Sequence, residues 1–421
     1  MLDNSFDVII VGGGPSGSMT GYRLAKAGVR VGILDAKKFP RDKGCGGGVQ
    51  EKAAQKIPFD WSSVKRGSLQ GLAFSFKLDD RFSRRYPLPL VHSVLRIEFD
   101  ELLLRQAEAA GARIFENVKA TDVSDMGNHA VVSTECGSFS AKVVVGADGA
   151  NGISKRSLNS RRDYYWQSGL YCEVPQDLLL LDAIEYDCMR VDWGTLPSGY
   201  AWMFPKRGFV NIGVGFPNSI GRMARPYLSK FLETERIVRP EFLNKVAFKG
   251  HQLPTLTDTT ALSKGRILLV GDAAGLIEPF TGDGISYALH SAEIAAEVII
   301  NALNTADFDL SAYEQRARAE IACELVWSRK LLSFFVAFPR MIHEVFKRND
   351  KVWGAFCRVL RGEDSFRVFR RKKFGALEFM WAPVDAFVER YERRKLRSPN
   401  EEEGAFVRTT GRLVGSFLRK V

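Results

Sequence analysis

The sequence predicts an α/β protein with three parts: a discontinuous Rossmann-type domain with a parallel sheet, an inserted domain with an antiparallel sheet, and a helical C-terminal region. Short apolar runs of strand length alternate with helical segments in the first third of the chain and again before residue 310, which is typical of a parallel sheet. Short alternating runs between residues 160 and 258, such as GFVNIGVG, indicate an antiparallel sheet. Residues 311–421 have mostly helical character.

Four apolar runs are predicted to form the parallel sheet, at residues 7–11, 30–35, 143–147 and 266–270. Three segments are predicted as helices, at residues 14–27, 96–110 and 284–304. The second of these helices has apolar residues at i, i+3 and i+4 and ends at Gly111, a residue type that commonly ends helices.

Two insertions separate these elements and define the domain boundaries. We predict a nucleotide-binding domain at 1–50, 93–159 and 260–310, a substrate-binding domain at 51–92 and 160–259, and a C-terminal helical, basic region at 311–421.

Composition excludes several classes of protein. The chain has 421 residues, of which 45% are hydrophobic and 26% charged, as in ordinary globular proteins. The N-terminus lacks the basic segment of a secretory signal, and no apolar run reaches the roughly 20 residues of a membrane span. The six cysteines form neither a CxxC pair nor a Cys/His cluster, so we predict no metal site. We expect a cytoplasmic protein with reduced thiols.

A glycine-rich turn follows the first predicted strand. DVIIVGGGPSG places Gly12, Gly14 and Gly17 at GxGxxG spacing between a strand and a helix. The first glycine permits the tight turn, the second lets the backbone approach a pyrophosphate, and the third lets the helix pack on the strand. Asp35 ends the second strand, where a carboxylate can accept hydrogen bonds from an adenosine ribose. We therefore predict a dinucleotide site at this turn and the helix N-terminus that follows it, in preference to a glycine turn without a ligand.

Rossmann units bind NAD as well as FAD, and two further segments favour FAD. GRILLVGDAAGLIEPFTGDGISYAL at 265–289 resembles the second FAD fingerprint of the p-hydroxybenzoate-hydroxylase-like flavoproteins. That resemblance implies that Asp272 binds the ribityl chain and that the turn at 282–284 lies under the isoalloxazine, where a helix N-terminus would stabilise negative charge near N1 of a reduced flavin. VVVGADGA at 143–150 resembles the superfamily's middle motif, and Arg96 matches the arginine that reaches the FAD phosphates.

The nucleotide-binding domain is therefore predicted to be an FAD-binding domain. The alternative for Asp148 and Asp272 is that they are turn residues before a helix. The predicted cofactor contacts are Gly12, Gly14, Pro15, Ser16, Gly17, Asp35, Arg41, Gly46, Gly47, Arg96, Val118, Asp148, Gly149, Gly271, Asp272, Pro279, Gly282, Gly284 and Ile285.

Two more segments resemble the geranylgeranyl reductase family. FPRDKGCGGGV at 39–49 resembles that family's PRxKxCGGG segment, and LPSGYAWMFPK at 196–206 matches its P-x-x-Y-x-W-x-F-P motif. The resemblance covers residues 5–310 and departs from the usual residues at Asp35 and Asp283. It implies a reductase that saturates isolated C=C bonds of a geranylgeranyl-type isoprenoid chain on a lipid, pigment or polyprenyl substrate.

The second motif carries the predicted substrate contacts. Tyr200, Trp202 and Phe204 alternate along one strand, so they should lie on one face and suit an apolar tail, together with Pro205. The alternative is that these aromatic side chains fill the core of their domain.

Cys45 and Tyr200 are the predicted catalytic residues, as first and second candidates for donating or positioning the proton that an alkene needs besides hydride. Glycines flank Cys45 on both sides and allow close approach of a flat ligand. In the resembling family this cysteine lies over the flavin. The alternative is a loop thiol without a chemical role. Facing aromatic rings could stabilise cationic character on the alkene.

The electron source is left open by the sequence. No second GxGxxG domain is present, so we expect either NAD(P)H bound transiently or a small electron-carrier protein.

The net charge of +11 is concentrated near the C-terminus, where residues 340–421 hold 20 Lys and Arg against 11 Asp and Glu. Basic residues interleaved with aromatic ones, from Arg370 to Lys395, suit the anionic inner face of a membrane. A solvated helical face is the alternative. No nucleic-acid-binding motif accompanies the charge, and we expect no nucleic acid partner.

Three rival functions share parts of the pattern. An FAD-dependent monooxygenase or halogenase acting on a hydrophobic or aromatic substrate has the same FAD motifs, although the halogenase W-x-W-x-I-P is replaced by YAWMFP. The second rival is an electron-transfer flavoprotein that reduces quinone. The larger members of that class carry a cluster of iron–sulfur cysteines, which this sequence lacks. A flavin-binding scaffold without catalysis is the third rival.

Overall fold

The structure is a computed structural model that describes residues 4–158, 164–180, 184–196, 198–239, 241 and 246–374. The chain divides into two compact units. Unit 1 consists of Met1–Arg66, His92–Gln167 and Gln252–Leu325, and unit 2 consists of Gly67–Val91, Ser168–His251 and Val326–Val421. The assignment of cofactor and substrate to particular residue ranges stays a prediction.

Unit 1 contains the predicted parallel sheet. Its strands follow the order β17-β18-β11-β1-β2-β8, and the hairpin of β9 and β10 extends β11. β1 is parallel to both β2 and β11, with Ile9 opposite Val144 and Val11 opposite Gly146, and the four strands predicted from sequence are confirmed. The bounds are β1 Ser5–Val11, β2 Val31–Leu34, β8 Arg113–Phe115, β9 Ala120–Asp125, β10 Ala130–Thr134, β11 Gly137–Gly146, β17 Ser263–Lys264 and β18 Ile267–Leu269.

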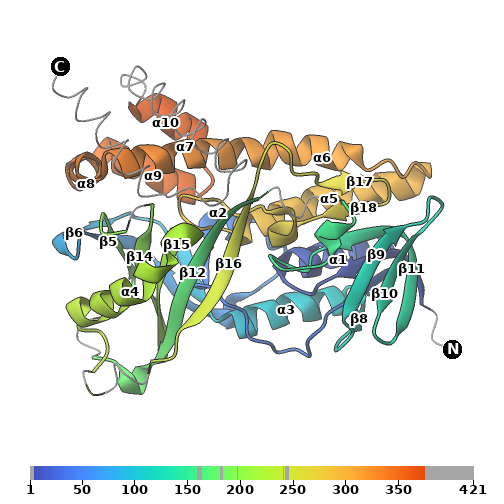
Figure 1. Cartoon of the computed structure of the whole chain (residues 1–421), viewed down its shortest axis with the longest axis horizontal. Coiled ribbons are helices and arrows are strands. Elements are labelled where there is room, and N and C mark those ends of the chain that lie inside the picture. Colours follow the sequence, from blue (N-terminus) through green and yellow to red (C-terminus); the bar gives the residue numbers. More distant parts are fainter. Residues whose placement is uncertain are drawn as a thin grey trace. The chain divides into compact units, whose positions relative to one another are not determined.

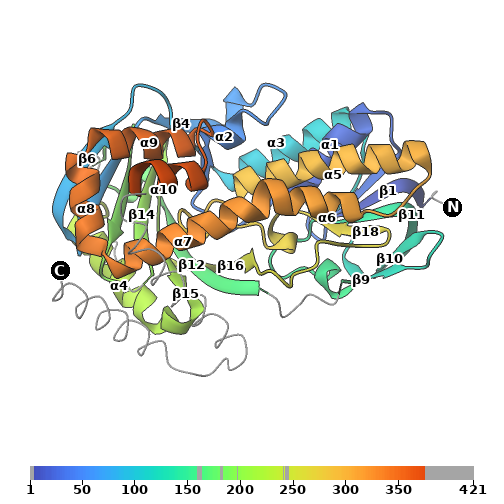
Figure 2. The same cartoon turned by 90° about the horizontal axis from the view of Figure 1, so that it is seen from above.

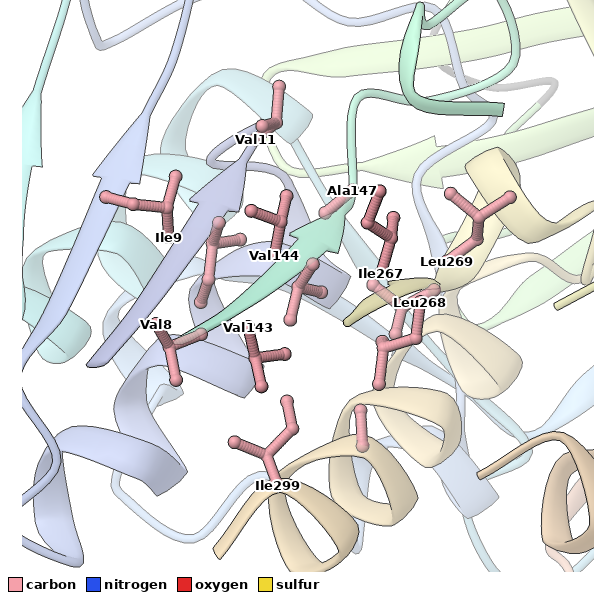
Figure 3. Packing of buried hydrophobic residues seen from close by; sticks show 14 of the residues in the cluster. Val8, Ile9, Val11, Val143, Val144, Ala147, Ile267, Leu268, Leu269 and Ile299 are labelled. Carbon is pink, nitrogen blue, oxygen red and sulfur yellow. The ribbon is translucent and has the colours of Figure 1, made fainter. Parts of the chain in front are cut away.

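Unit 1 also contains three long helices, and all three were predicted: α1 Pro15–Lys26, α3 Arg96–Ala109 and α5 Ile285–Thr305. The central strands are apolar on both faces, as expected for parallel strands covered on both sides. Val8 and Val143 lie on neighbouring strands on the side of Ile299 of α5 (Figure 3). Burial of each such side chain stabilises the fold by about 1.5–3 kcal/mol. The core therefore fixes the strands, and the strands fix the loops that follow them.

A small sheet lies beside these elements in the order β3-β7-β4. Its strands are β3 Gly48–Gln50, β7 Val91–Val94 and β4 Lys65–Leu69, and β3 leads directly into the short helix α2 at Glu51–Ala54. The glycine-rich segment before β3 is thereby tied to the sheet, because Val94 N–H donates to Gly47 O at 2.8 Å.

Unit 2 is built on a seven-stranded sheet in the order β16-β12-β15-β14-β13-β5-β6. β14 pairs antiparallel with β13 and β15, as predicted, whereas β13 and β5 run parallel. The helix α4 at Gly221–Glu235 packs against β15 (Figure 1). The strand bounds are β5 Gly71–Phe76, β6 Asp79–Arg85, β12 Tyr164–Pro175, β13 Cys188–Trp193, β14 Tyr200–Lys206, β15 Phe209–Pro217 and β16 Lys249–Leu256.

The C-terminal part is helical as far as it is described. A π-helical turn at Arg318–Ala322 joins α6 to α7, and α9 and α10 lie side by side (Figure 2). The bounds are α6 Ser311–Ala317, α7 Cys323–Ala337, α8 Pro339–Arg348, α9 Asp350–Leu360 and α10 Phe366–Phe374. Within the described ranges, no helix has both the length and the apolar character that crossing a membrane requires. Most of the predicted basic and aromatic segment, from residue 375 onward, lies outside the described residues.

A buried carboxylate holds unit 2 together and supports a stability test. Asp192 is fully buried and accepts hydrogen bonds from Ser75 Oγ at 2.6 Å, Leu78 N–H at 2.7 Å and the Tyr227 hydroxyl. Burial raises the pKa of Asp192, although these donors act in the opposite direction. Asp192→Ala leaves three donors without their acceptor, so we expect the free energy of unfolding of the full chain to fall by about 3 kcal/mol in urea titrations.

The matched control is Asp187→Ala. Asp187 is half-exposed and pairs with Arg85, and exposed pairs of this kind contribute less than about 1 kcal/mol. Equal losses in the two variants would show that the Asp192 hydrogen bonds do not stabilise the fold.

Candidate functional site

The turn between β1 and α1 is shaped by backbone contacts that only glycine allows. Gly12 has φ of 107°, and a Cβ there would lie 2.3 Å from Ala147 O. A Cβ at Gly17 would lie 1.9 Å from Gly12 O, whereas one at Gly14 would meet only Arg41 Nη2, at 3.5 Å. Pro15 opens the helix, and Gly14 offers no side-chain cap. The first N–H groups of α1 are therefore available to an anion such as a phosphate.

Asp35 holds this turn from the neighbouring strand. Its carboxylate accepts the N–H of Gly13 at 2.8 Å and of Lys37 at 2.9 Å, and its own carbonyl accepts the Val118 N–H at 2.9 Å. A carboxylate has about four lone-pair positions, so Asp35 keeps capacity for a ribose hydroxyl. The predicted contacts Asp35 and Val118 thus lie together at the end of β2.

Two arginines share one buried carboxylate beside the turn. Arg96 binds Asp100 with two hydrogen bonds, of 2.7 and 2.8 Å, and Arg41 reaches the same carboxylate at 3.2 Å. Burial lowers the pKa of Arg96, but Asp100 and the adjacent Cys45 thiol outweigh it, so that the pKa lies above its usual range. Arg41 lies next to Gly14 and is placed to bind a phosphate at the start of α1.

The loop that carries Cys45 contacts the second fingerprint. Lys43 Nζ lies 3.3 Å from Asp272 Oδ2, and burial, the largest effect, lowers the pKa of Lys43. The half-buried Cys45 accepts the Gly47 N–H at 3.3 Å, and Gly47 has φ of 72°. Lys43 was not among the predicted site residues, although the PRxKxCGGG resemblance contains a lysine at its position.

The second fingerprint lies against the first. Gly271 has φ of 57°, and a Cβ there would lie 2.6 Å from Ser16 Oγ. A Cβ at Gly284 would lie 3.3 Å from Asp272 Oδ1, so Asp272 is next to the N-terminus of α5. The predicted residues Pro279, Gly282 and Ile285 belong to the same turn and helix start. Elements about 260 residues apart in sequence thus form one site in unit 1.

Sequence reasoning missed a group of polar residues around this turn. Glu278 is fully buried and accepts the N–H groups of Phe280 at 2.5 Å and Thr281 at 2.9 Å, together with the Thr281 hydroxyl. Gln50 Nε2 donates to Thr281 Oγ1 at 3.2 Å, and Lys52 pairs with Asp283 at 3.1 Å. The signal for Glu278 was a single acid in the apolar run LIEPF, and nothing local pointed to Lys52.

Glu278 gives a test by pH. Burial raises its pKa to about 7, against the opposing influence of Lys52 and Thr281. Because the folded state holds the proton more tightly than the unfolded state, this contribution to stability is fully present below the unfolded pKa of about 4.3 and is lost as pH rises through 7. We expect the melting temperature of the FAD-loaded wild type to fall, relative to Glu278→Gln, between pH 5 and pH 8. A difference between the two proteins that is constant over this range would contradict the shift.

Buried polar atoms show that the site fits a polar ligand. Among the described residues, Asp148 Oδ1, Gln50 Oε1 and Ser286 Oγ are buried without a hydrogen-bond partner. The other oxygen of Asp148 accepts the N–H and hydroxyl of Ser154 at 2.9 and 3.0 Å, and burial raises the pKa of Asp148. A Cβ at Gly149, with φ of 78°, would meet nothing within 4 Å. Unsatisfied buried groups are rare unless a ligand or water completes them, so these residues suit FAD.

The predicted aromatic strand lies in unit 2. Trp202 Nε1–H donates to Asn211 Oδ1 at 2.7 Å, and a Cβ at Gly213 would lie 2.3 Å from the indole, so the ring packs against β15. The Tyr200 and Trp202 ring centres are 6.0 Å apart. By strand alternation Phe204 shares their face, while Pro205 lies on the opposite face with Met203. Trp202 is 8% exposed, and Tyr200 and Phe204 are half-buried.

Known proteins resemble this chain over most of its length. The family model of an FAD binding domain matches residues 5–57. An uncharacterized protein of Methanosarcina barkeri is 34% identical over 78% of this chain and 84% of its own length. Digeranylgeranylglycerophospholipid reductase 2 of Methanothermobacter thermautotrophicus is 30% identical over 85% and 92%. A menaquinone reductase of Mycobacterium tuberculosis is 30% identical over 71% and 77%.

Solved structures share the fold. A geranylgeranyl bacteriochlorophyll reductase-like protein of Thermoplasma acidophilum has a TM-score of 0.67 at 24% identity and covers 78% of this chain and 88% of its own. A flavin-dependent brominase has a TM-score of 0.68 at 19% identity and covers 93% and 100%. At these identities the likeness concerns the fold.

Proposed function

This chain belongs to the geranylgeranyl reductase-like family of FAD-dependent oxidoreductases, and we propose that it saturates isolated C=C bonds in an isoprenoid chain carried by a lipid, pigment or polyprenyl substrate. The relative that is similar over 85% of this chain is named for reducing a digeranylgeranyl phospholipid. The observation that carries the proposal is the contact between Lys43 and Asp272, because it joins the reductase-like loop around Cys45 to the FAD fingerprint.

FAD, once reduced by the electron donor, would supply hydride when it is bound, and the chain's residues would bind the substrate and deliver the proton. An isolated alkene has no carbonyl to polarise, so a proton must reach one carbon while positive character develops at the more substituted carbon. Cys45 is the proposed donor or positioning group, since its thiol interacts with Arg96 and its loop contacts Asp272 through Lys43. Tyr200 is the second candidate. Tyr200, Trp202 and Phe204 would contact the apolar tail and stabilise the charge.

Two attributes complete the proposal. The chain has no second GxGxxG turn, and so no dedicated NAD(P)H domain. The electron donor is therefore NAD(P)H that binds transiently or a small electron-carrier protein. The excess of basic residues after residue 340 supports attachment to an anionic membrane surface, where a lipid-linked isoprenoid is found. Co-sedimentation with anionic liposomes at low salt and release at high salt would support the attachment; no pelleting at either salt concentration would rule it out.

Mass spectrometry of cellular lipids and pigments tests the activity. In cells that contain the protein, we expect isoprenoid species heavier by two daltons per reduced bond than in cells that lack it. Identical isoprenoid masses in the two samples would contradict the proposal. Products heavier by oxygen or bromine would instead support the monooxygenase or halogenase alternative.

A further inference from the structure

A buried ion pair lies at the N-terminus of α5, outside the predicted site residues. Lys52 Nζ is 3.1 Å from Asp283 Oδ2, 3.3 Å from the Tyr287 hydroxyl and 4.6 Å from the centre of the Tyr287 ring. The Lys52 side chain is 16% exposed and that of Asp283 is 2% exposed. Burial lowers the pKa of Lys52, but the charges and hydroxyl around it outweigh burial and raise it overall, so the ammonium is charged at neutral pH.

The pair is tied to a turn that is held at both ends. Asp283 Oδ1 accepts the Ser286 N–H at 3.1 Å and so caps α5. Glu278 N–H donates to Asp283 O, and Gly282 N–H donates to Glu278 O, both at 3.0 Å. Lys52 reaches this turn from α2, a different part of the sequence. The Lys52 ammonium therefore lies beside the turn at residues 282–284, and the Asp283 carboxylate lies within it.

The charges of Lys52 and Asp283 act electrostatically on a ligand bound at the turn. A helix N-terminus already carries about half a positive charge, and buried charges are screened far less than exposed ones. A reduced flavin carries negative charge near N1. A cation beside the turn would therefore favour the reduced flavin, and an anion would favour the oxidised flavin.

We infer that Lys52 and Asp283 together set the reduction potential of the bound flavin, with Lys52 raising it and Asp283 lowering it. The inference rests on the proposed site, in which this turn holds the isoalloxazine. Lys52 and Asp283 would act on the flavin through their electric field, without contact with the substrate.

A second lysine of the same segment provides the matched control. Lys56 Nζ lies 2.7 Å from Glu293 Oε2, so it also ties the α2 segment to α5, but both side chains are 28% exposed. Glu293 lies ten residues beyond Asp283, about 15 Å further along the helix at 1.5 Å per residue. If the lysines served only to tie the two segments together, both pairs would behave alike.

The test is the midpoint potential of FAD-loaded protein, measured by anaerobic titration with an indicator dye. We expect Lys52→Met to lower the potential by at least about 30 mV, which is a tenfold change in the ratio of reduced to oxidised flavin for a two-electron couple. Asp283→Asn should raise the potential by a similar amount, because it removes the negative charge. Asparagine still accepts the helix N–H, so the turn should keep its structure. Lys52→Arg should restore the wild-type value, and Lys56→Met should leave it unchanged.

Shifts of the same sign in Lys52→Met and Asp283→Asn would overturn the inference, as would unchanged potentials with flavin bound. Loss of flavin from both variants would show that the ion pair has a structural role, and would overturn the inference as well. A wild-type protein that takes up no FAD would overturn the proposed site itself, and that outcome is seen before any variant is compared.

Discussion

Gly12→Ala is expected to weaken FAD binding strongly. Gly12 has φ of 107°, and an added Cβ would lie 2.3 Å from Ala147 O and 2.9 Å from Asp148 N. Both neighbours are backbone atoms at the end of β11, so the turn after β1 and the loop at Asp148 must separate. Because both segments are predicted to bind the cofactor, we expect the dissociation constant of FAD to rise at least about 100-fold, or about 2.7 kcal/mol. The absorbance of purified protein and an FAD titration measure this.

Gly28→Ala is the control for backbone strain alone. Gly28 also has a positive φ, of 80°, but an added Cβ there would meet nothing within 4 Å. The substitution should cost about 1–2 kcal/mol of stability and leave FAD affinity unchanged. If Gly12→Ala bound FAD as well as Gly28→Ala does, the first glycine turn would not be the cofactor site.

Cys45→Ser is expected to slow alkene reduction about 100-fold while FAD stays bound, because a positioned proton donor typically contributes that much or more. The thiol lies beside Arg96 and accepts the Gly47 N–H, and a hydroxyl of similar size can keep these contacts. The measurement is the rate at which pre-reduced protein is reoxidised by a geranylgeranyl substrate without oxygen.

Cys136→Ser is the matched control, because Cys136 is exposed between β10 and β11. We expect no change in its reoxidation rate. Equal rates for Cys45→Ser and the wild type would remove Cys45 from the reaction and leave Tyr200 as the next residue to replace.

Much of the fold was predictable because its signals are local. The apolar runs that became β1, β2, β11 and β18 are bounded by glycines and charged residues, and their continuous burial follows from the parallel sheet. The helix α3 was predicted to within one residue, since its apolar periodicity ends at Gly111. Antiparallel pairing of β14 and β15 was predictable from alternation and a short connection.

Other features depend on contacts that sequence does not place. The parallel pairing of β13 with β5 joins segments more than 110 residues apart, and nothing in either strand specifies its partner. The Lys52–Asp283 pair and the Lys43–Asp272 pair each join segments more than 225 residues apart. In contrast, the alternation of side chains along β14 was enough to predict that Pro205 faces away from Trp202 and Phe204.

An anaerobic single-turnover experiment on purified protein tests directly whether the reduced flavin saturates an isoprenoid double bond. The FAD-loaded protein is reduced, freed of excess reductant and mixed with a geranylgeranyl lipid while flavin absorbance and product mass are followed. We expect the yellow oxidised spectrum to return without oxygen and the product to be two daltons heavier than the substrate. A flavin that stays reduced until oxygen is admitted, with the lipid mass unchanged, would contradict it.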